Sequence, residues 1–519
     1  MKKPNRRGAS ALVAGSAVAA LLVAGCSSAS TTSSSGGGTA AASGNGTLVF
    51  GITADTTQMV PWTATAEQSV QVLPQLYSTL LGKDASGDLT PGLAGFPAVS
   101  DGGDTYTFTL KSGVKFADGK SLTSADVKYT FDTIMNPASA AVSATYFASV
   151  ASVAAPTPTT VVVHMKHPDA SFPAGLSTIQ TGIVPSGATA TTLQTSPDGS
   201  GPYEFVSHVP NESITLKRNP DYYGGTPGVA TLKFLVIPDD QSMVSALRTG
   251  AVDAAVFTDP VTAKTATSNT VAIETAGSLQ YHVLQLRAAS PVLSNVNNRL
   301  AIQCAISRQN VIDSSALGAG QVTGPITSPL YKSNPADQPC PTQNLAKAKQ
   351  YLAKAGDPNG FTLNVITSQG LYASAVDEAQ SVQSQLGQVG IKVNVQTLSA
   401  SAYVSDWLAG NFEAAIAENG GSIDPNTMYA RYFTSTGSFS KVAGYSSPTL
   451  NSLFAQGIAT TSTAQRQAIY QQISNQLVDN AAWVWLYTPE YYIAVNTSVH
   501  GLQARTDADL SALWQASIS

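Results

Sequence analysis

The segment Asp104–Met135 is the most strongly patterned stretch of the chain and constrains the class of fold. Over residues 105–110, large side chains alternate with threonine, which predicts a half-buried strand. Lys111–Gly113 can turn the chain into a second short strand at 114–116. Thr123–Asp126 then matches a capping box, and apolar residues recur after it at helical spacing. The segment therefore predicts a strand, a turn, a second strand and a capped helix. None of its residues indicates catalysis, so we interpret it as part of the scaffold.

The N-terminus has the pattern of a secretory signal. Four basic residues within the first seven precede an apolar run at Ala11–Gly25, which is too short and too rich in alanine to span a membrane. Small residues stand directly before Cys26, as a lipoprotein signal peptidase requires. We expect residues 1–25 to be removed and Cys26 to carry a diacylglyceryl group, because two acyl chains anchor a protein stably. The alternative is an ordinary signal peptide with a chance cysteine.

The residues after Cys26 and the net charge of the chain limit the kinds of molecule that the protein can bind. Residues 27–46 contain only serine, alanine, threonine, glycine and asparagine, so 26–46 is predicted to be a disordered tether. Loss of the signal peptide removes four basic residues and changes the formal net charge from −5 to −9. A mildly acidic chain without basic blocks argues against a nucleic-acid partner. The remaining length suffices for two or three domains.

Few residues offer catalytic or metal-binding chemistry. Apart from Cys26 there are two cysteines, Cys304 and Cys340, which outside the cell favour a disulfide; the alternative is two buried thiols. His164 and His167 have a spacing that could suit a metal, but such a pair is more often polar surface. No nucleophile elbow precedes a helix, and no paired carboxylates indicate acid–base work. We therefore expect no metal, no cofactor and no enzymatic activity.

The later part of the chain alternates between strand and helix patterns. Residues 361–366, 376–389 and 391–395 form a strand–helix–strand unit in which Gly390 stops the helix. Such a unit requires a largely parallel pair of strands and a right-handed crossover. Other predicted elements are strands at 159–165, 232–237, 280–286 and 483–487 and helices at 68–81 (interrupted by Pro74), 242–248 and 465–478.

The run from Phe108 to Phe131 resembles the signature segment of the family-5 extracellular solute-binding proteins, which reads roughly FxLRxGVKFxDGxPLTAxDVxFSF. Further likenesses cover almost the whole mature chain in the family's order, at 81–94, 199–203, 218–223, 246–253, 299–308 and 345–356. These proteins are the oligopeptide, dipeptide and nickel-binding receptors of ATP-driven (ABC) importers.

The resemblance implies an α/β, two-lobed periplasmic-binding-protein-like fold (type II, cluster C-like) with an extra subdomain inserted in the first lobe. The first lobe would combine 47–88, 196–279 and 484–519, with 89–195 as the inserted subdomain and 280–483 as the second lobe. It also implies a monomeric receptor, anchored by lipid at the extracellular face of the cytoplasmic membrane, with ABC permease and ATPase subunits as partners.

A two-lobed receptor closes a cleft around its ligand, and such a cleft needs aromatic walls and a few charges. The candidate walls are aromatic residues, for each of which the alternative is core packing: Trp62, Tyr281, Trp407, Trp483 and Trp485. In peptide-binding members, a loop that ends in Asp-Pro carries an aspartate that pairs with the peptide's α-ammonium. Aligned here on Asp424-Pro425, that position holds Gly421.

Glu418 offers the missing carboxylate at a shifted position, and the loop Asn419-Gly420-Gly421 lets a ligand approach the backbone closely. The alternative is that Glu418 is a solvated loop residue. We expect a peptide ligand. The glycine at position 421 also favours a non-peptide solute such as a sugar, opine, siderophore or metal chelate, and a secreted hydrolase is a more distant alternative.

Overall fold

The computed structural model describes residues 46–257 and 259–519. The predictions for the signal peptide, for Cys26 and for all but the last residue of the tether lie outside these residues. Within the described ranges, no helix combines the length and apolarity that crossing a membrane requires.

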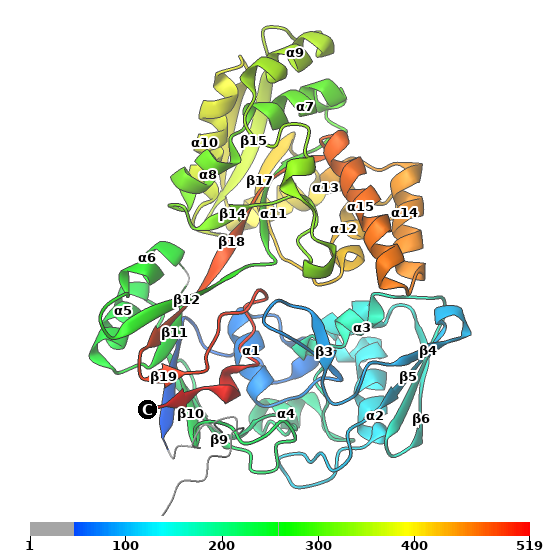
Figure 1. Cartoon of the computed structure of the whole chain (residues 1–519), viewed down its shortest axis with the longest axis vertical. Helices are drawn as coiled ribbons and strands as arrows, with labels where there is room; N and C mark the ends of the chain where they lie inside the picture. The colour runs from blue at the N-terminus through cyan, green and yellow to red at the C-terminus, as the bar shows by residue number, and fades with distance from the viewer. Residues whose placement is uncertain (1–45, 258) are drawn as a thin grey trace, which may run out of the picture. The chain divides into compact units, whose positions relative to one another are not determined.

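One long strand connects the two halves of the main sheet. β18 (Trp483–Asn496) pairs through its first residues with β13 (Tyr281–Leu286) and β14 (Gly320–Val322), and through its last residues with β11 (Ala254–Val256) and β12 (Val271–Gly277). In Figure 1, β18 runs from the group around β17 to the group around β11. Residues 278–280, between β12 and β13, make the second connection. The strand predicted at 483–487 is therefore much longer than the sequence pattern indicated.

The half of the sheet on the β11 side is built from both ends of the chain. β1 (Thr47–Ile52) pairs in parallel with β10 (Thr231–Val236) and with β11, and β9 (Ser213–Arg218) and β8 (Tyr203–Val209) follow β10 antiparallel. α5 (Asp240–Thr249) joins β10 to β11 and ends at Gly250, whose φ of 72° is the left-handed conformation that favours glycine. The other elements here are α6 (Pro260–Thr265), β2 (Leu81–Lys83), β3 (Leu89–Pro91), β19 (Val499–His500) and β20 (Ser517–Ile518).

The half on the β13 side contains the predicted strand–helix–strand unit. β15 (Thr362–Gln369) and β16 (Lys392–Ser399) are parallel and are joined by α10 (Ala375–Gly387), as predicted. β17 (Ala414–Asn419) pairs with β15 in parallel and with β13 antiparallel. The helices of this half are α7 (Val296–Ala305), α8 (Arg308–Ser315), α9 (Leu345–Ala355), α11 (Ala400–Ala409), α12 (Pro425–Phe433), α13 (Ser440–Ala443), α14 (Pro448–Ala459) and α15 (Thr463–Asp479).

Two large hydrophobic cores correspond to these halves. The first core gathers side chains from 48–234, from β11 and from the C-terminal residues 493–516, and a small satellite cluster lies under α5. The second core gathers side chains almost entirely from 281–492. We call them the first and second cores below.

The segment Asp104–Met135 folds largely as its pattern indicates. β5 (Thr105–Thr109) belongs to a four-stranded sheet in the order β4 (Ala98–Ser100), β5, β7 (Thr160–Met165), β6 (Val150–Thr157). The Asp126 carboxylate accepts a hydrogen bond from the Thr123 N–H at 2.8 Å and caps α2 (Ser124–Met135). The strand predicted at 114–116 is wrong: Gly113 and Gly119 turn the chain so tightly that only one bridge, Lys115 to Ser121, forms.

The helix predicted over 68–81 is also too long. α1 (Glu67–Val72) is followed by a 3₁₀ turn at Leu73–Gln75, and the helical conformation ends there. Pro74 lacks an N–H and cannot continue the α-helical hydrogen bonds. The remaining short helices are α3 (Phe172–Gly175) and α4 (Ala190–Thr195).

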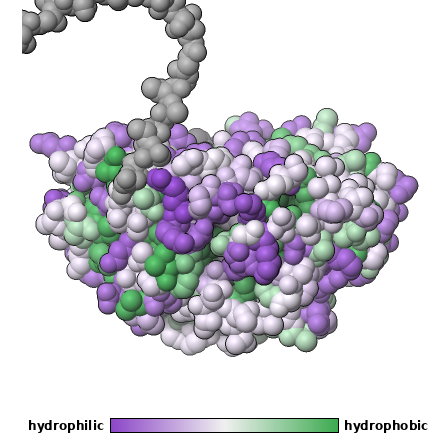
Figure 2. All heavy atoms as spheres, turned by 90° about the horizontal axis from the view of Figure 1, so that it is seen from below, coloured by the Kyte–Doolittle hydropathy of each residue, from purple (hydrophilic) through white to green (hydrophobic). Residues whose placement is uncertain are grey.

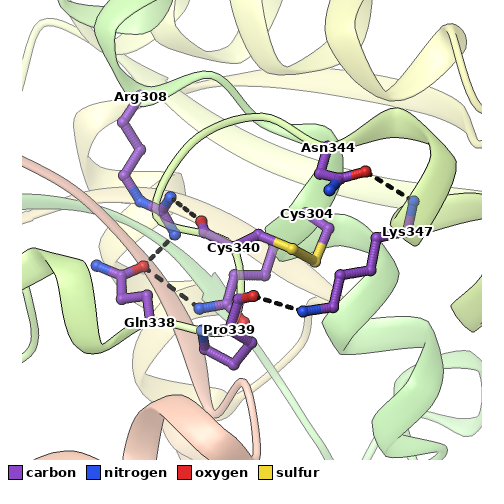
Figure 3. The surroundings of a disulfide bond; sticks show 8 residues. Cys304, Arg308, Gln338, Pro339, Cys340, Asn344 and Lys347 are labelled. Carbon is purple, nitrogen blue, oxygen red and sulfur yellow. Dashed lines mark hydrogen bonds between the residues drawn. A yellow bond between two sulfur atoms is a disulfide. The ribbon is translucent and has the colours of Figure 1, made fainter.

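Cys304 on α7 and Cys340 before α9 form a disulfide that closes a separation of 36 residues (Figure 3). Arg308 lies beside it, donating to the carbonyl of Cys340 at 3.0 Å and to that of Trp485 at 2.8 Å. Burial lowers the pKa of Arg308 to about 10. The bridge and the guanidinium together fix the segment before α9 to α7, α8 and β18.

The outer surface is mixed in character. On the face drawn in Figure 2, most residues are hydrophilic or of intermediate hydropathy, and the hydrophobic ones lie in small scattered groups. Scattered apolar side chains are normal on a water-facing surface and need no functional explanation.

Candidate functional site

The ends of three adjacent strands bring a carboxylate, an imidazole and a phenol together. His282 on β13 lies opposite Glu418 on β17 and opposite Tyr487 on β18. Residues directly opposite one another in an antiparallel pair place their side chains on the same face of the sheet. The strand alternation of β13 thus directs His282 toward this face, and the neighbouring Tyr281 toward the other.

Glu378, from the first turns of α10, covers this face and binds all its neighbours through one oxygen. Its Oε1 lies 2.7 Å from His282 Nδ1 and accepts hydrogen bonds from Tyr487 OH at 2.7 Å and Ser374 Oγ at 2.6 Å. Glu378 is completely buried, and its Oε2 has no partner among the described residues. The His282 ring stacks on Tyr487 at 4.3 Å and meets the edge of Tyr372 at 5.2 Å. We call these five residues the Glu378 cluster.

Electrostatics couple the cluster to Glu418. Burial lowers the pKa of His282, but the attraction of Glu378, and then of Glu418, outweighs it, so the pKa of His282 is raised and the imidazolium is favoured. Burial raises the pKa of the Glu418 carboxyl; His282 opposes this shift, while Glu378 and Glu67 add to it. Glu67 belongs to α1, at the first core, and accepts a hydrogen bond from Tyr491 on β18. Charged groups from both halves of the molecule therefore influence the pKa of Glu418.

A cavity of about 230 Å³ opens beside the cluster. Its walls come from the last two residues of β15 (Ser368 and Gln369), from residues 370–373 in the connection to α10, and from Val376 in the first turn of α10. Tyr372 belongs both to these walls and to the Glu378 cluster.

The loop after β17 lies where the two halves meet. A Cβ built on Gly421 would come closer than 3.0 Å to the Cβ, C and O atoms of Leu279, in the connection between β12 and β13. A Cβ built on Gly87, from the first half of the chain, would lie 3.5 Å from Ile423. The structure thus leaves no room for a side chain at position 421 unless the 278–280 connection moves.

Comparison with known proteins identifies the family. The model of the bacterial extracellular solute-binding proteins, family 5 (middle region), matches residues 88–440. The chain belongs to this family. The oligopeptide-binding protein AppA of Bacillus subtilis (strain 168) is 27% identical over 493 residues, which cover 90% of each chain.

Solved structures of the family share the fold. AppA from Bacillus subtilis, in complex with a nonapeptide, aligns over 91% of this chain and 99% of its own with 25% identity and a TM-score of 0.71. AgaA from Agrobacterium tumefaciens R10, in complex with agropinic acid, aligns over 91% and 99% with 24% identity and a TM-score of 0.73. This family-5 protein therefore has the mixed α/β, type II periplasmic-binding-protein fold and is a solute-binding protein of an ABC importer.

Position 421 has no room for a larger side chain in this protein. The family resemblance implies an aspartate at this position, and Leu279 fills the space that a side chain on residue 421 would need. Glu418, three residues earlier near the end of β17, is partly exposed. Gly420 faces open space.

Asp424 has partners inside the protein. Its carboxylate caps α12 by accepting from the Asn426 N–H at 2.9 Å and pairs with Arg466 at 2.6 Å, and both side chains are buried. Arg466 also donates to the carbonyl of Ala170, which belongs to the first half of the chain. Asp424 is thus already neutralised by Arg466.

The aromatic residues predicted to line the cleft lie in different parts of the structure. Trp62 lies in the first core and Tyr281 and Trp485 lie in the second, all buried. Trp407 is partly exposed and donates to Gln285 Oε1 at 2.6 Å. Asn419 is buried, with its Oδ1 accepting from Tyr432 and its Nδ2 without a partner among the described residues.

Sequence reasoning missed His282 and Glu378. Both are charged or titratable side chains in buried positions of otherwise apolar elements: Glu378 lies on the face of α10 that also carries Ala379, Val382 and Leu386. The sequence did contain a signal for Glu378, because it places a carboxylate on the apolar face of an amphipathic helix. Such a carboxylate is seldom buried without a partner, so the pattern predicts a buried partner for it. Within the described residues, no group of three acidic, histidine or cysteine side chains is arranged to hold a metal ion.

Proposed function

We propose that this protein captures peptides with a free amino terminus outside the cytoplasmic membrane and delivers them to an ABC permease. The observation that carries the proposal is Glu418, a partly exposed carboxylate at the meeting of the two halves. Glu378, Glu67 and His282 are the charged groups that act on it, and in the described part of the chain no lysine or arginine pairs with it. An ammonium group of the ligand would supply that partner. The likeness to an oligopeptide-binding protein supports the same ligand class.

The capture step that we propose is hinge closure. One lobe would combine residues 47–88, 196–279 and 484–519 with the subdomain 89–195 inserted in it, and the other would be 280–483. Only β18 and residues 278–280 would need to bend, because they are the two connections between the cores. A ligand that contacts Glu418 from one side and the α1 region from the other selects the closed state. We propose that the protein acts as a monomer and binds its ligand without cleaving it.

Lipid anchoring through Cys26 is part of the same proposal. The small residues before Cys26 support it, because they are what a lipoprotein signal peptidase requires. Metabolic labelling with a fatty acid should label the wild-type protein and leave the variant C26A unlabelled. Equal labelling of C26A would mean that the lipid is attached elsewhere.

Isothermal titration calorimetry with matched ligands tests the amine site. A tripeptide should bind the wild-type protein, and its N-acetylated counterpart should bind about ten-fold or more weakly, because a charge-assisted hydrogen bond contributes about 1.5–3 kcal/mol. The variant E418Q should lose this discrimination. The control E274Q removes an exposed carboxylate on β12 and should retain it. Equal affinity for both tripeptides would remove Glu418 from the site.

A second candidate function is capture of a non-peptide solute such as an opine. It is favoured by one observation: residue 421 is a glycine, whereas the family resemblance implies an acid there that pairs with a peptide amine. Binding of an opine or sugar to protein that ignores tripeptides would select this alternative.

A further inference from the structure

A second cavity lies in the half of the molecule that contains the first core. Its volume is about 330 Å³, within the range of about 300–1,000 Å³ that small-molecule sites have. Four segments far apart in the chain line it: residues 74–92, 177–179, 222–223 and 509–515. None of the described residues that line it belongs to 280–483, the part of the chain that carries Glu418. A ligand in this cavity would therefore occupy a site separate from the proposed amine site.

The charged groups at this cavity already neutralise one another. Lys83 and Asp509 line it, and Lys83 Nζ lies 2.5 Å from Asp507 Oδ2 and 3.8 Å from Asp509 Oδ2. Arg505 Nε lies 3.9 Å from Asp507 Oδ1 and 3.7 Å from Asp509 Oδ1. Burial opposes the charge on Lys83, but the attraction of Asp507 and Asp509 outweighs it and raises the pKa of Lys83. A charged ligand would have to compete with these pairs, whereas a neutral ligand would not.

Polar side chains that are free to bind a ligand line the same cavity. Thr90 and Ser511 are partly exposed, and Gln515 is exposed. The side chains of these three residues form no hydrogen bond with another described residue. Hydroxyl and carboxamide groups each donate and accept hydrogen bonds, so the matching ligand has groups that do both, as hydroxyls do.

Three aromatic rings give the cavity an apolar side. The ring of Tyr222 lies edge-on to Trp514 at 5.3 Å and 4.9 Å from the ring of Tyr223. All three line the cavity and are partly exposed. A sugar ring matches such a surface, because its C–H groups can pack against aromatic rings while the hydroxyls around its edge form hydrogen bonds. A linear polyol has the hydroxyls but lacks the ring face.

We propose that this cavity binds a neutral sugar ring, either a free monosaccharide or one unit of a glycan, independently of peptide capture. The proposal does not rest on the proposed function, because the two sites use different residues. Only one half of the molecule encloses the sugar, so hinge closure does not strengthen its binding. We therefore expect weak, millimolar affinity, and a sugar bound here should be lost during purification.

Saturation-transfer difference NMR with glucose, N-acetylglucosamine and the β-1,4-linked trimer of N-acetylglucosamine tests the proposal. At least one of them should give signals, whereas glycerol, which has no ring, should give none. Affinity for the trimer about ten-fold or more above that for the monosaccharide would indicate a glycan unit, and equal affinities a free sugar. The signals should persist in E418Q and with saturating tripeptide. Absence of signals from all three sugars would refute the site while peptide capture stands.

Substitutions assign the binding to the cavity. T90V and S511A remove hydroxyls without a partner among the described residues, so both should melt like the wild type and weaken sugar binding about two- to ten-fold, the effect of one hydrogen bond. W514L removes an aromatic face and should weaken binding by a similar factor. The control S405A removes an exposed hydroxyl from α11, in the other half, and should bind sugar like the wild type. Unchanged sugar binding in T90V, S511A and W514L would overturn the assignment, because the sugar would then occupy another site.

Discussion

Replacing Gly421 by aspartate would introduce the acid that the resemblance to peptide-binding family members implies at this position, yet we expect the replacement to destabilise this protein. A side chain at 421 would come closer than 3.0 Å to the Cβ, C and O of Leu279, whereas ordinary contacts begin at 3.4 Å. Leu279 cannot withdraw freely, because its N–H donates to Thr506 O at 2.9 Å and its carbonyl accepts from Thr327 Oγ1 at 2.7 Å. The clash falls on one of the two connections between the cores.

The variant G421A isolates the steric part of this effect. Overpacking of this kind costs about 1–3 kcal/mol, so G421A should lower the free energy of unfolding by that amount and G421D by at least as much. Urea unfolding followed by tryptophan fluorescence measures it, since Trp483 and Trp485 are fully buried in the second core.

A neighbouring glycine provides the control for this prediction. A Cβ on Gly420 would meet no atom within 4 Å, so G420A should unfold like the wild type. The steric reasoning is refuted if G421A is as stable as G420A. It is also refuted if G421D keeps wild-type stability and binds amine-bearing tripeptides more tightly, because the loop would then accommodate the family's acid.

Three further predictions concern charge and covalent structure. Because the pKa of Glu418 is raised, its carboxylate should be protonated at a higher pH than that of an ordinary glutamate, whose pKa is 4.5. Tripeptide affinity, measured from pH 7 downward, should therefore begin to fall at a higher pH than it would for an ordinary glutamate. A fall that begins only below pH 4.5 would contradict this. The double variant C304S/C340S should lose about 4 kcal/mol in urea unfolding, since the bridge closes a separation of 36 residues, and an unchanged midpoint would argue against a bond. D424N, which leaves the buried Arg466 guanidinium without its carboxylate, should cost about 3 kcal/mol by the same assay, and wild-type stability would show the pair to be dispensable.

Local features of this fold were predictable because they depend on neighbouring residues. The capping box at Thr123–Asp126 and the strand–helix–strand unit around α10 both follow from short patterns. The strand predicted at 114–116 failed because strand formation needs a partner, and the chain turns back too soon to provide more than one bridge. The length of β18 likewise depends on four distant strands that pair with it.

The candidate site was predictable only in part. Glu418 stands out in the sequence because the loop around it departs from the family pattern, but its neighbours come from elements far apart in the chain. His282 and Glu378 pair only through the tertiary packing of β13 against α10. The steric reason for Gly421 is similarly visible only once Leu279 is placed beside it.

Native mass spectrometry of the protein purified without denaturation tests whether it captures peptides. We expect an added mass that fragments as a short peptide with a free amino terminus and that is lost after unfolding and refolding in its absence. Removal of the ligand should leave a protein that takes up a supplied tripeptide in one-to-one stoichiometry. A bound sugar, opine or chelate, or an empty protein that takes up no tripeptide, would contradict it.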